Sequence, residues 1–230
     1  MTSIRLEKLF GGDTVEGTEH RCSEVLRSWV CDYLIRPHPD LGRSGPVCPF
    51  TNPSISRGLL WVGFIDGGGV GVQQMTEAVD EIFGAFPELP PVDGDDALLK
   101  AVLLVFPDVS DYSLIEEAQR EGKSKFVREG LMLGQFYPGC TTSGLRNKAF
   151  PALDAPLPIL AVRNMVGSDF PFLAERSEWV DAYLKKFANR IPGPVRSSIT
   201  EKVVGNRSPR TRVRTGRQDG SGVTATAATR

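Results

Sequence analysis

Residues able to do chemistry are concentrated in two proline- and glycine-rich stretches of the chain. Residues 36–50 read R-P-H-P-D-L-G-R-S-G-P-V-C-P-F and hold one of the two histidines and one of the four cysteines. Residues 136–151 read F-Y-P-G-C-T-T-S-G-L-R-N-K-A-F-P and hold another cysteine. Because proline fixes φ and pushes the preceding residue to an extended geometry, neither stretch suits a helix or a central strand. We predict two stiff loops that together form one site.

The first loop carries a candidate nucleophile and a candidate metal ligand. His38 and Cys48 could form a thiolate–imidazole pair, although they stand ten residues apart. The alternative is that Cys48 packs under the sheet as a small apolar residue while His38 caps a turn. The chain has no C-x-x-C or H-x3-H pair, so the spacing does not indicate a structural zinc site.

Arginine is the second chemical signal in and beside these loops. The candidates are Arg43, Arg146 and Arg163. A guanidinium fork holds a carboxylate or phosphate through two parallel hydrogen bonds, so an arginine cluster would suit an anionic group. The alternative is that these arginines form ion pairs that pin the loops, with Asp40, Asp154 and Asp169 as the partners.

Charge is distributed unevenly along the chain. Of 230 residues 40% are hydrophobic, enough for a substantial core, and the net charge is −1. Residues 190–230 hold nine basic and two acidic residues, a balance of +7, so the remainder carries −8. We expect this basic tail to be disordered and solvated. It lacks interleaved aromatic residues and the body is acidic, which argues against a nucleic-acid partner.

The periodicity of apolar residues predicts an α/β fold, an α+β sandwich of about four strands flanked by helices in the order α-β-α-β-α-β-β-α. The expected helices are 19–35, 72–86, 112–128 and 175–188. The expected strands are 58–65, 98–106, 131–137 and 157–163. We expect a loose N-terminal arm at 1–17, one globular domain at 18–189 and the tail at 190–230. The glycine run at 66–71 departs from the dinucleotide-binding spacing and favours a plain turn.

Several features point to a cytoplasmic protein. Residues 1–17 lack the apolar segment of a secretory signal, and no run of eighteen or more apolar residues indicates a membrane span. Four cysteines in a chain of this length are typical of reduced thiols.

The motifs together resemble those of a known family. P-H-P-D-L-G-R-S-G-P-V-C-P-F, R-G-L-L-W, F-Y-P-G-C, G-L-R-N-K-A-F and I-L-A-V-R-N-M-V-G-S-D-F-P-F-L are similar to an uncharacterised, mostly actinobacterial domain of unknown function. The similarity extends over about residues 25–187. It implies no particular activity.

A shorter segment, V-C-P-F followed by R-G-L-L-W-V-G-F-I, is similar to the opening of YqcI/YcgG-type haem-dependent N-oxygenases. This resemblance implies a haem with Cys48 or His38 as the axial ligand of its iron. It implies that Arg43, Arg146 and Arg163 would hold the haem propionates or a substrate carboxylate, and that Tyr137 would contact oxygen or substrate. The apolar walls would be Phe50, Trp61 and Phe136. The cysteine precedes the proline here, the reverse of that group's motif.

Three functions follow as expectations. The first is a haem-dependent oxygenase of specialised metabolism that hydroxylates a small amine or amino acid and uses a redox partner. The second is a non-catalytic binding or accessory protein of a biosynthetic cluster, whose loops recognise a small anion or a partner. The third is a cysteine-dependent hydrolase or transferase, which would require Cys48 to be an accessible thiol of low pKa.

Overall fold

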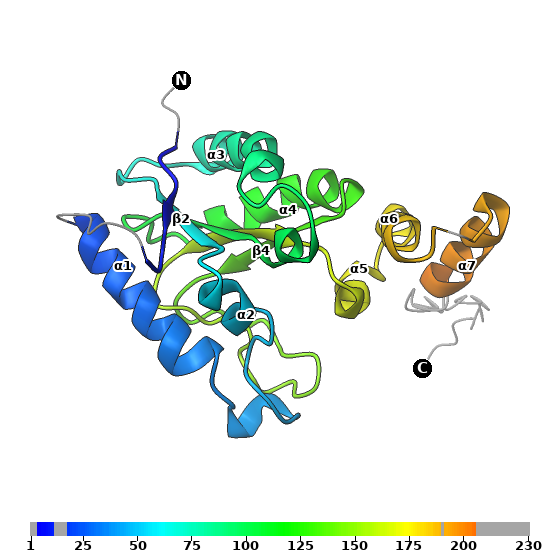
Figure 1. Cartoon of the computed structure of the whole chain (residues 1–230), viewed down its shortest axis with the longest axis horizontal. Helices are drawn as coiled ribbons and strands as arrows, with labels where there is room; N and C mark the ends of the chain where they lie inside the picture. Colours follow the sequence, from blue (N-terminus) through cyan, green and yellow to red (C-terminus); the bar gives the residue numbers. More distant parts are fainter. Residues whose placement is uncertain (1–3, 12–17, 190, 206–230) are drawn as a thin grey trace, which may run out of the picture.

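A five-stranded mixed sheet with helices on both faces forms the body of the protein (Figure 1). The computed structural model describes residues 4–11, 18–189 and 191–205. The strands are β1 (Glu7–Lys8), β2 (Leu60–Phe64), β3 (Ala101–Val105), β4 (Leu131–Phe136) and β5 (Ile159–Asn164). The helices are α1 (Thr18–Trp29), α2 (Thr51–Ser56), α3 (Val72–Ala85), α4 (Ser113–Arg128), α5 (Phe170–Leu173), α6 (Ser177–Phe187) and α7 (Gly193–Gly205). The α/β class expected from the sequence is confirmed.

The strand order is β1-β2-β3-β5-β4. β2 and β3 are parallel, with Val62 opposite Leu103, and β5 runs antiparallel to both of its neighbours, β3 and β4. Parallel neighbours need a crossover, which α3 supplies between β2 and β3. Because β2, β3 and β4 run in the same direction, their carboxyl ends lie at the same end of the sheet, where the antiparallel β5 begins.

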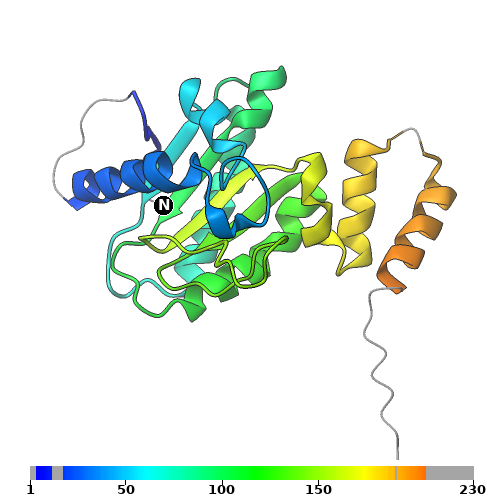
Figure 2. The ribbon, with the colours of Figure 1, turned by 90° about the horizontal axis from the view of Figure 1, so that it is seen from below.

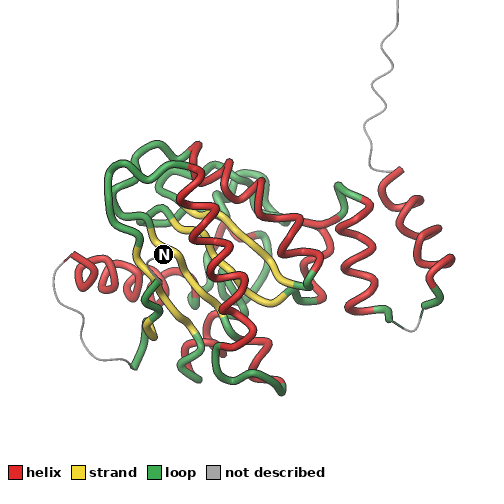
Figure 3. The backbone as a smooth tube through the Cα atoms, turned by 90° about the horizontal axis from the view of Figure 1, so that it is seen from above, coloured by secondary structure: helices red, strands yellow, loops and turns green. Residues whose placement is uncertain are grey.

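Helices α3 and α4 cover one face of the sheet (Figure 3). Met75, Val79 and Ile82 of α3 pack with Ile115 and Phe126 of α4, all of them buried. Alternate residues of β3, β4 and β5 face this core: Val102, Leu104, Leu131, Leu133, Leu160 and Val162. The alternation follows from the period of two along a strand and explains why the strands read as continuous apolar runs.

The other face is covered by α1 and by the chain that leaves the second loop. Leu26 and Val30 contact the sheet residues Leu103, Val105 and Ile159. Beyond α1 the helix continues as a π-helical turn, Val30–Leu34, in which the Ile35 amide donates to the Val30 carbonyl over 3.1 Å. This turn ends at the first loop.

The expected loose N-terminal arm is wrong for residues 4–11. Glu7 and Lys8 pair antiparallel with Val62 and Trp61 of β2, which adds the fifth strand. Ile4 and Leu6 pack toward the core under α3 and α4, whereas Leu9 is fully buried in the core under α1. Apolar residues on both sides of a short strand stabilise it, although Arg5, Glu7 and Lys8 interrupt the pattern in the sequence. Residues 12–17 of the expected arm lie outside the described residues.

The expected disorder from residue 190 onward is also wrong in part, because Gly193–Gly205 form helix α7. Figure 2 shows α6 and α7 side by side at one end of the molecule. Arg196 of α7 donates to Asp181 of α6 over 2.8 Å, and Thr200 is buried. Residues 206–230 of the expected tail lie outside the described residues. No helix within the described ranges is both long and apolar enough to span a membrane.

Backbone groups along the edge strand β4 and just beyond it form hydrogen bonds with a helix side chain and with the chain that follows the second loop. Gln119 of α4 donates its side-chain amide to the Leu133 carbonyl over 2.9 Å. Just past the end of β4, the Tyr137 amide donates to Leu153 and the Tyr137 carbonyl accepts from Ala155. The second loop thus returns along the edge strand before entering β5.

Candidate functional site

The two proline- and glycine-rich loops, which we predict from the sequence to form one site, pack against each other. In this description the first loop is residues 36–50 and the second loop is residues 136–151. The Asn147 side chain donates to the Asp40 carbonyl over 2.8 Å, across a sequence separation of 107 residues. Figure 1 shows the first loop and the second loop together beside α2.

Gly42 is a point of close approach between the loops. Its φ of +73° lies in the left-handed region, and it ends the short 3-10 turn Pro39–Leu41. A Cβ atom at this position would lie 3.0 Å from Cβ of Arg146 and 3.2 Å from its carbonyl carbon. Both the backbone conformation and the contact with Arg146 therefore require glycine here.

An aromatic cluster joins the loops from the inside. Phe150 of the second loop is buried, with its ring 5.1 Å from the His38 ring and 6.4 Å from the Tyr33 ring. Tyr33 lies on the π-helical turn that precedes the first loop. Such turns are uncommon and are found frequently at functional sites. We call Tyr33, His38 and Phe150 the aromatic joint.

His38 caps a turn, as one of the alternatives from the sequence predicted. Its Nδ1 accepts the Asp40 amide over 3.2 Å at the start of the 3-10 turn. The Asp40 carboxylate lies 3.9 Å from the same nitrogen. The imidazole is thereby oriented by the first loop itself and by the Phe150 ring.

Cys48 is not paired with His38. Among the described residues no hydrogen bond joins the Cys48 thiol to the His38 ring. The Cys48 amide donates to the Leu34 carbonyl over 2.8 Å, which closes the base of the first loop. Cys140 is buried, with its Sγ 3.4 Å from the Thr142 hydroxyl. The four cysteines are free thiols.

Tyr137 faces away from the aromatic joint. It packs against the core under α3 and α4, its ring stacks on Tyr112 at 5.1 Å, and its hydroxyl donates to the Glu116 carboxylate. Burial raises the pKa of the Tyr137 phenol above its ordinary value, and hydrogen bonds with Glu116 and Cys140 raise it further. The phenol is therefore protonated at neutral pH, held by a glutamate that the sequence did not single out.

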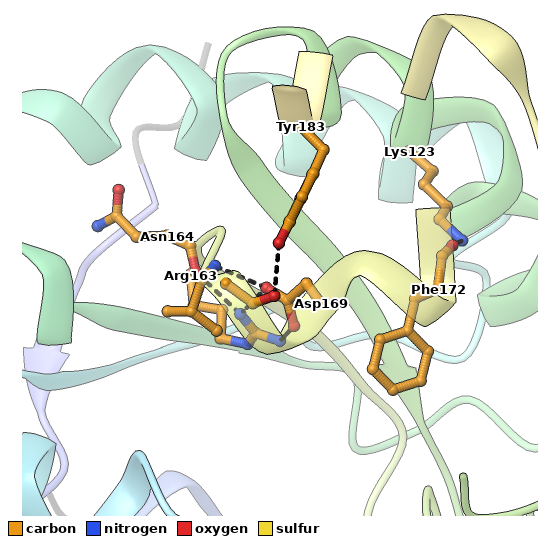
Figure 4. A network of polar contacts seen from close by, with 8 residues as sticks. Lys123, Arg163, Asn164, Asp169, Phe172 and Tyr183 are labelled. Atoms are coloured by element: carbon orange, nitrogen blue, oxygen red, sulfur yellow. Dashed lines mark hydrogen bonds and ion pairs between the residues drawn. The ribbon is translucent and has the colours of Figure 1, made fainter. Parts of the chain in front are cut away.

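Arg163 is engaged in a bidentate ion pair with Asp169 (Figure 4). The two hydrogen bonds measure 2.7 and 2.6 Å, and Asp169 is 2% exposed. Asp169 also accepts the Val166 amide over 2.8 Å, and the Arg163 guanidinium lies 5.9 Å from the Phe50 ring. This is one of the three ion pairs that the sequence suggested; Asp40 and Asp154 have other partners.

The remaining arginines of the loops, Arg43 and Arg146, differ in whether their side chains form hydrogen bonds. The Arg43 guanidinium donates to the Ser44 and Val47 carbonyls, each over 3.0 Å, and so braces the first loop. Arg146 and Lys148 are exposed, and within the described residues neither side chain has a hydrogen bond or an ion pair. The outer surface of the joined loops thus presents two cationic side chains that form no ion pair with a carboxylate of the described residues.

The expected haem ligands and walls do not converge on one cavity. His38 is oriented by Asp40 and Phe150, Arg163 is bound to Asp169, and Tyr137 is bound to Glu116. Trp61 packs toward the core under α3 and α4, whereas Phe136 packs on Trp29 on the opposite face. These residues do not fit a haem in this arrangement, and we derive no chemistry through one. No cluster of metal-ligating side chains occurs in the part of the chain that the structure describes.

The sequence missed three residues that join the loops: Tyr33, Asn147 and Phe150. Tyr33 looked like one more apolar position of the first helix. Asn147 and Phe150 lay within the quoted loop, and their spacing gave no sign of a partner over a hundred residues away. A signal was present in the aromatic residue next to Pro151, because an aromatic ring in a polar loop usually packs against something.

Comparison with known proteins identifies a family but no activity. A family model described as a domain of unknown function (DUF6875) matches residues 23–198. No curated protein matches the chain, and no solved structure matches it.

The Arg163–Asp169 pair should be a major stabilising contact. Replacing Asp169 by Asn removes the charge that neutralises a half-buried guanidinium, and we expect a loss of about 2–4 kcal/mol in the free energy of unfolding. Urea denaturation of the wild type and the variant measures this change in the free energy of unfolding. Glu178→Gln, which breaks the exposed pair with Arg176, is the control and should change the value by less than about 1 kcal/mol. Equal losses in the two variants would contradict the assignment.

The aromatic joint should hold both loops. Phe150→Ala leaves a cavity between them, and we expect a loss of about 3–5 kcal/mol in the free energy of unfolding. Hydrogen exchange should accelerate in residues 36–48, far away in sequence, more than in β3. Phe187→Ala is the control, because that ring is 44% exposed. Unchanged exchange in the first loop would show that Phe150 does not join it.

Proposed function

The chain belongs to the DUF6875 family, and we propose that it is a non-catalytic binding or accessory protein whose joined loops recognise an anionic group. The observation that carries the proposal is the pair of exposed cations, Arg146 and Lys148, on a loop surface fixed by the aromatic joint. Recognition is favoured when the backbone that carries the cationic groups is fixed before the ligand arrives, because less conformational entropy is lost on binding.

The contacts of the other candidate residues favour binding over catalysis. A nucleophile needs a base within hydrogen-bond reach, and Cys48 has none in the described structure. Arg163 and Tyr137 are each engaged by a carboxylate, Asp169 and Glu116 respectively. The polar side chains of the loops thus serve to hold the loops, and the cations outside them are left to meet a ligand.

The proposal includes a cytoplasmic location. Four free thiols, two of them buried, suit a reducing compartment. The proposal also includes the role of an accessory component in specialised metabolism that was expected from the sequence.

An anion titration tests the loop surface directly. We expect inorganic phosphate and acetate to shift the backbone amide resonances of residues 144–149 in a heteronuclear NMR spectrum. The double variant Arg146→Gln, Lys148→Gln should lose most of these shifts, because the favourable Coulomb interaction disappears.

The matched control is Arg128→Gln, Lys185→Gln, which removes two exposed cations from α4 and α6. This variant should keep the shifts. Shifts that are equal in the two variants, or that lie outside the loops, would refute the proposed anion site.

A spectrum separates this proposal from the oxygenase expectation. Protein expressed with a haem precursor should show no Soret band that changes on reduction with dithionite and addition of carbon monoxide. A stoichiometric Soret band that is lost in Cys48→Ala or in His38→Ala would overturn the binding-protein proposal and would establish the haem ligand.

A further inference from the structure

We infer that the anionic group recognised by the joined loops belongs to an acidic polypeptide segment of a partner protein. This inference rests on the proposed function and names the class of its ligand. It follows from the spread of cations over both loops and from the apolar side chain beside them.

The cations are spread over a surface that contains both loops. Arg146 contacts Gly42, and Arg43 follows Gly42 in the first loop. Arg36 lies at the base of that loop, where its carbonyl accepts the Val47 amide over 2.9 Å. With Lys148, these exposed residues distribute positive charge across both loops. Such an array matches a chain with several carboxylates better than a single small anion.

A small molecule would require a concavity that buries most of its surface. One hollow in the described chain lies along α1, and the acidic residues Glu24 and Asp32 are among those that line it. Its other lining residues are Val25, Ser28, Trp29 and Pro156. The hollow therefore has the wrong charge for an anion.

Leu145 supplies an exposed apolar side chain on this surface. Its side chain is 52% exposed and precedes Arg146 in the chain. Protein interfaces combine an apolar centre with charged residues around it. An acidic segment that also carries apolar side chains would therefore satisfy Leu145 and the cations together.

The same surface is poorly suited to nucleic acid. Binding of single strands uses aromatic rings on which bases stack. Here Phe150 is buried, and the rings of the aromatic joint contact one another. Asp40, whose side chain is 71% exposed beside His38, adds a local negative charge that an acidic partner would have to avoid.

The test uses the full chain and a fluorescent peptide that alternates glutamate and leucine. We expect fluorescence anisotropy to detect binding that weakens as salt is raised. Arg146→Glu, Lys148→Glu should weaken binding about tenfold, and Leu145→Ser about threefold. Arg128→Glu, Lys185→Glu, the control with the same charge change elsewhere, should alter binding less than about twofold.

Three further probes decide between ligand classes. A peptide with glutamine in place of glutamate, a single-stranded DNA and vesicles containing phosphatidylserine should each bind more weakly than the acidic peptide. Preference for the DNA or the vesicles, or an acidic peptide that does not bind, overturns the inference. The phosphate titration then separates the two claims. If phosphate still shifts the loop resonances, the anion site stands without the peptide partner; if it does not, both fail.

Discussion

Burial of the central strands on both faces is the constraint on which the rest of this structure depends. In β3, Val102 and Leu104 face the core under α3 and α4, while Leu103 and Val105 face the core under α1. The crossover helices suffice for the first face only. The second face must be closed by α1 and by the chain leaving the second loop, which brings residues 36–50 and 136–151 together. The position of the candidate site is thus a consequence of covering the sheet.

Most polar side chains discussed for the two loops form hydrogen bonds that hold the loops in place. His38 and Arg43 satisfy backbone groups of the first loop, and Asn147 satisfies one across the interface. Buried or partly buried polar groups are costly unless they are paired, so such use of side chains is expected wherever irregular backbone packs closely. What remains for a ligand is the set of side chains pointing outward from an already fixed surface.

The sequence predicted the parts of the fold that depend on local pattern. Continuous apolar runs gave β2 to β5, and the spacing of apolar residues gave α1, α3, α4 and α6. Strand β1 was not predicted from the sequence, because this strand consists of only two residues, Glu7 and Lys8, paired with β2. Helix α7 was not predicted from the sequence either. Helix signals were present, because Pro194 lies near its start and apolar residues recur at steps of four at Val195, Ile199 and Val203. The loops were recognisable from proline and glycine, whereas their partners were not, because the contact of Asn147 with Asp40 is decided by tertiary packing alone.

The treatment of the sheet edge has a consequence for how this protein can associate. β1 has two residues, and at β4 the Leu133 carbonyl and both backbone groups of Tyr137 are already hydrogen-bonded. An edge with few free backbone groups is a poor template for an incoming strand, whether from a partner or from another copy during aggregation. The two-residue β1 in particular offers no long register to copy. For the proposed partner, selectivity would then reside in side chains of the loops, which can change while the sheet stays untouched.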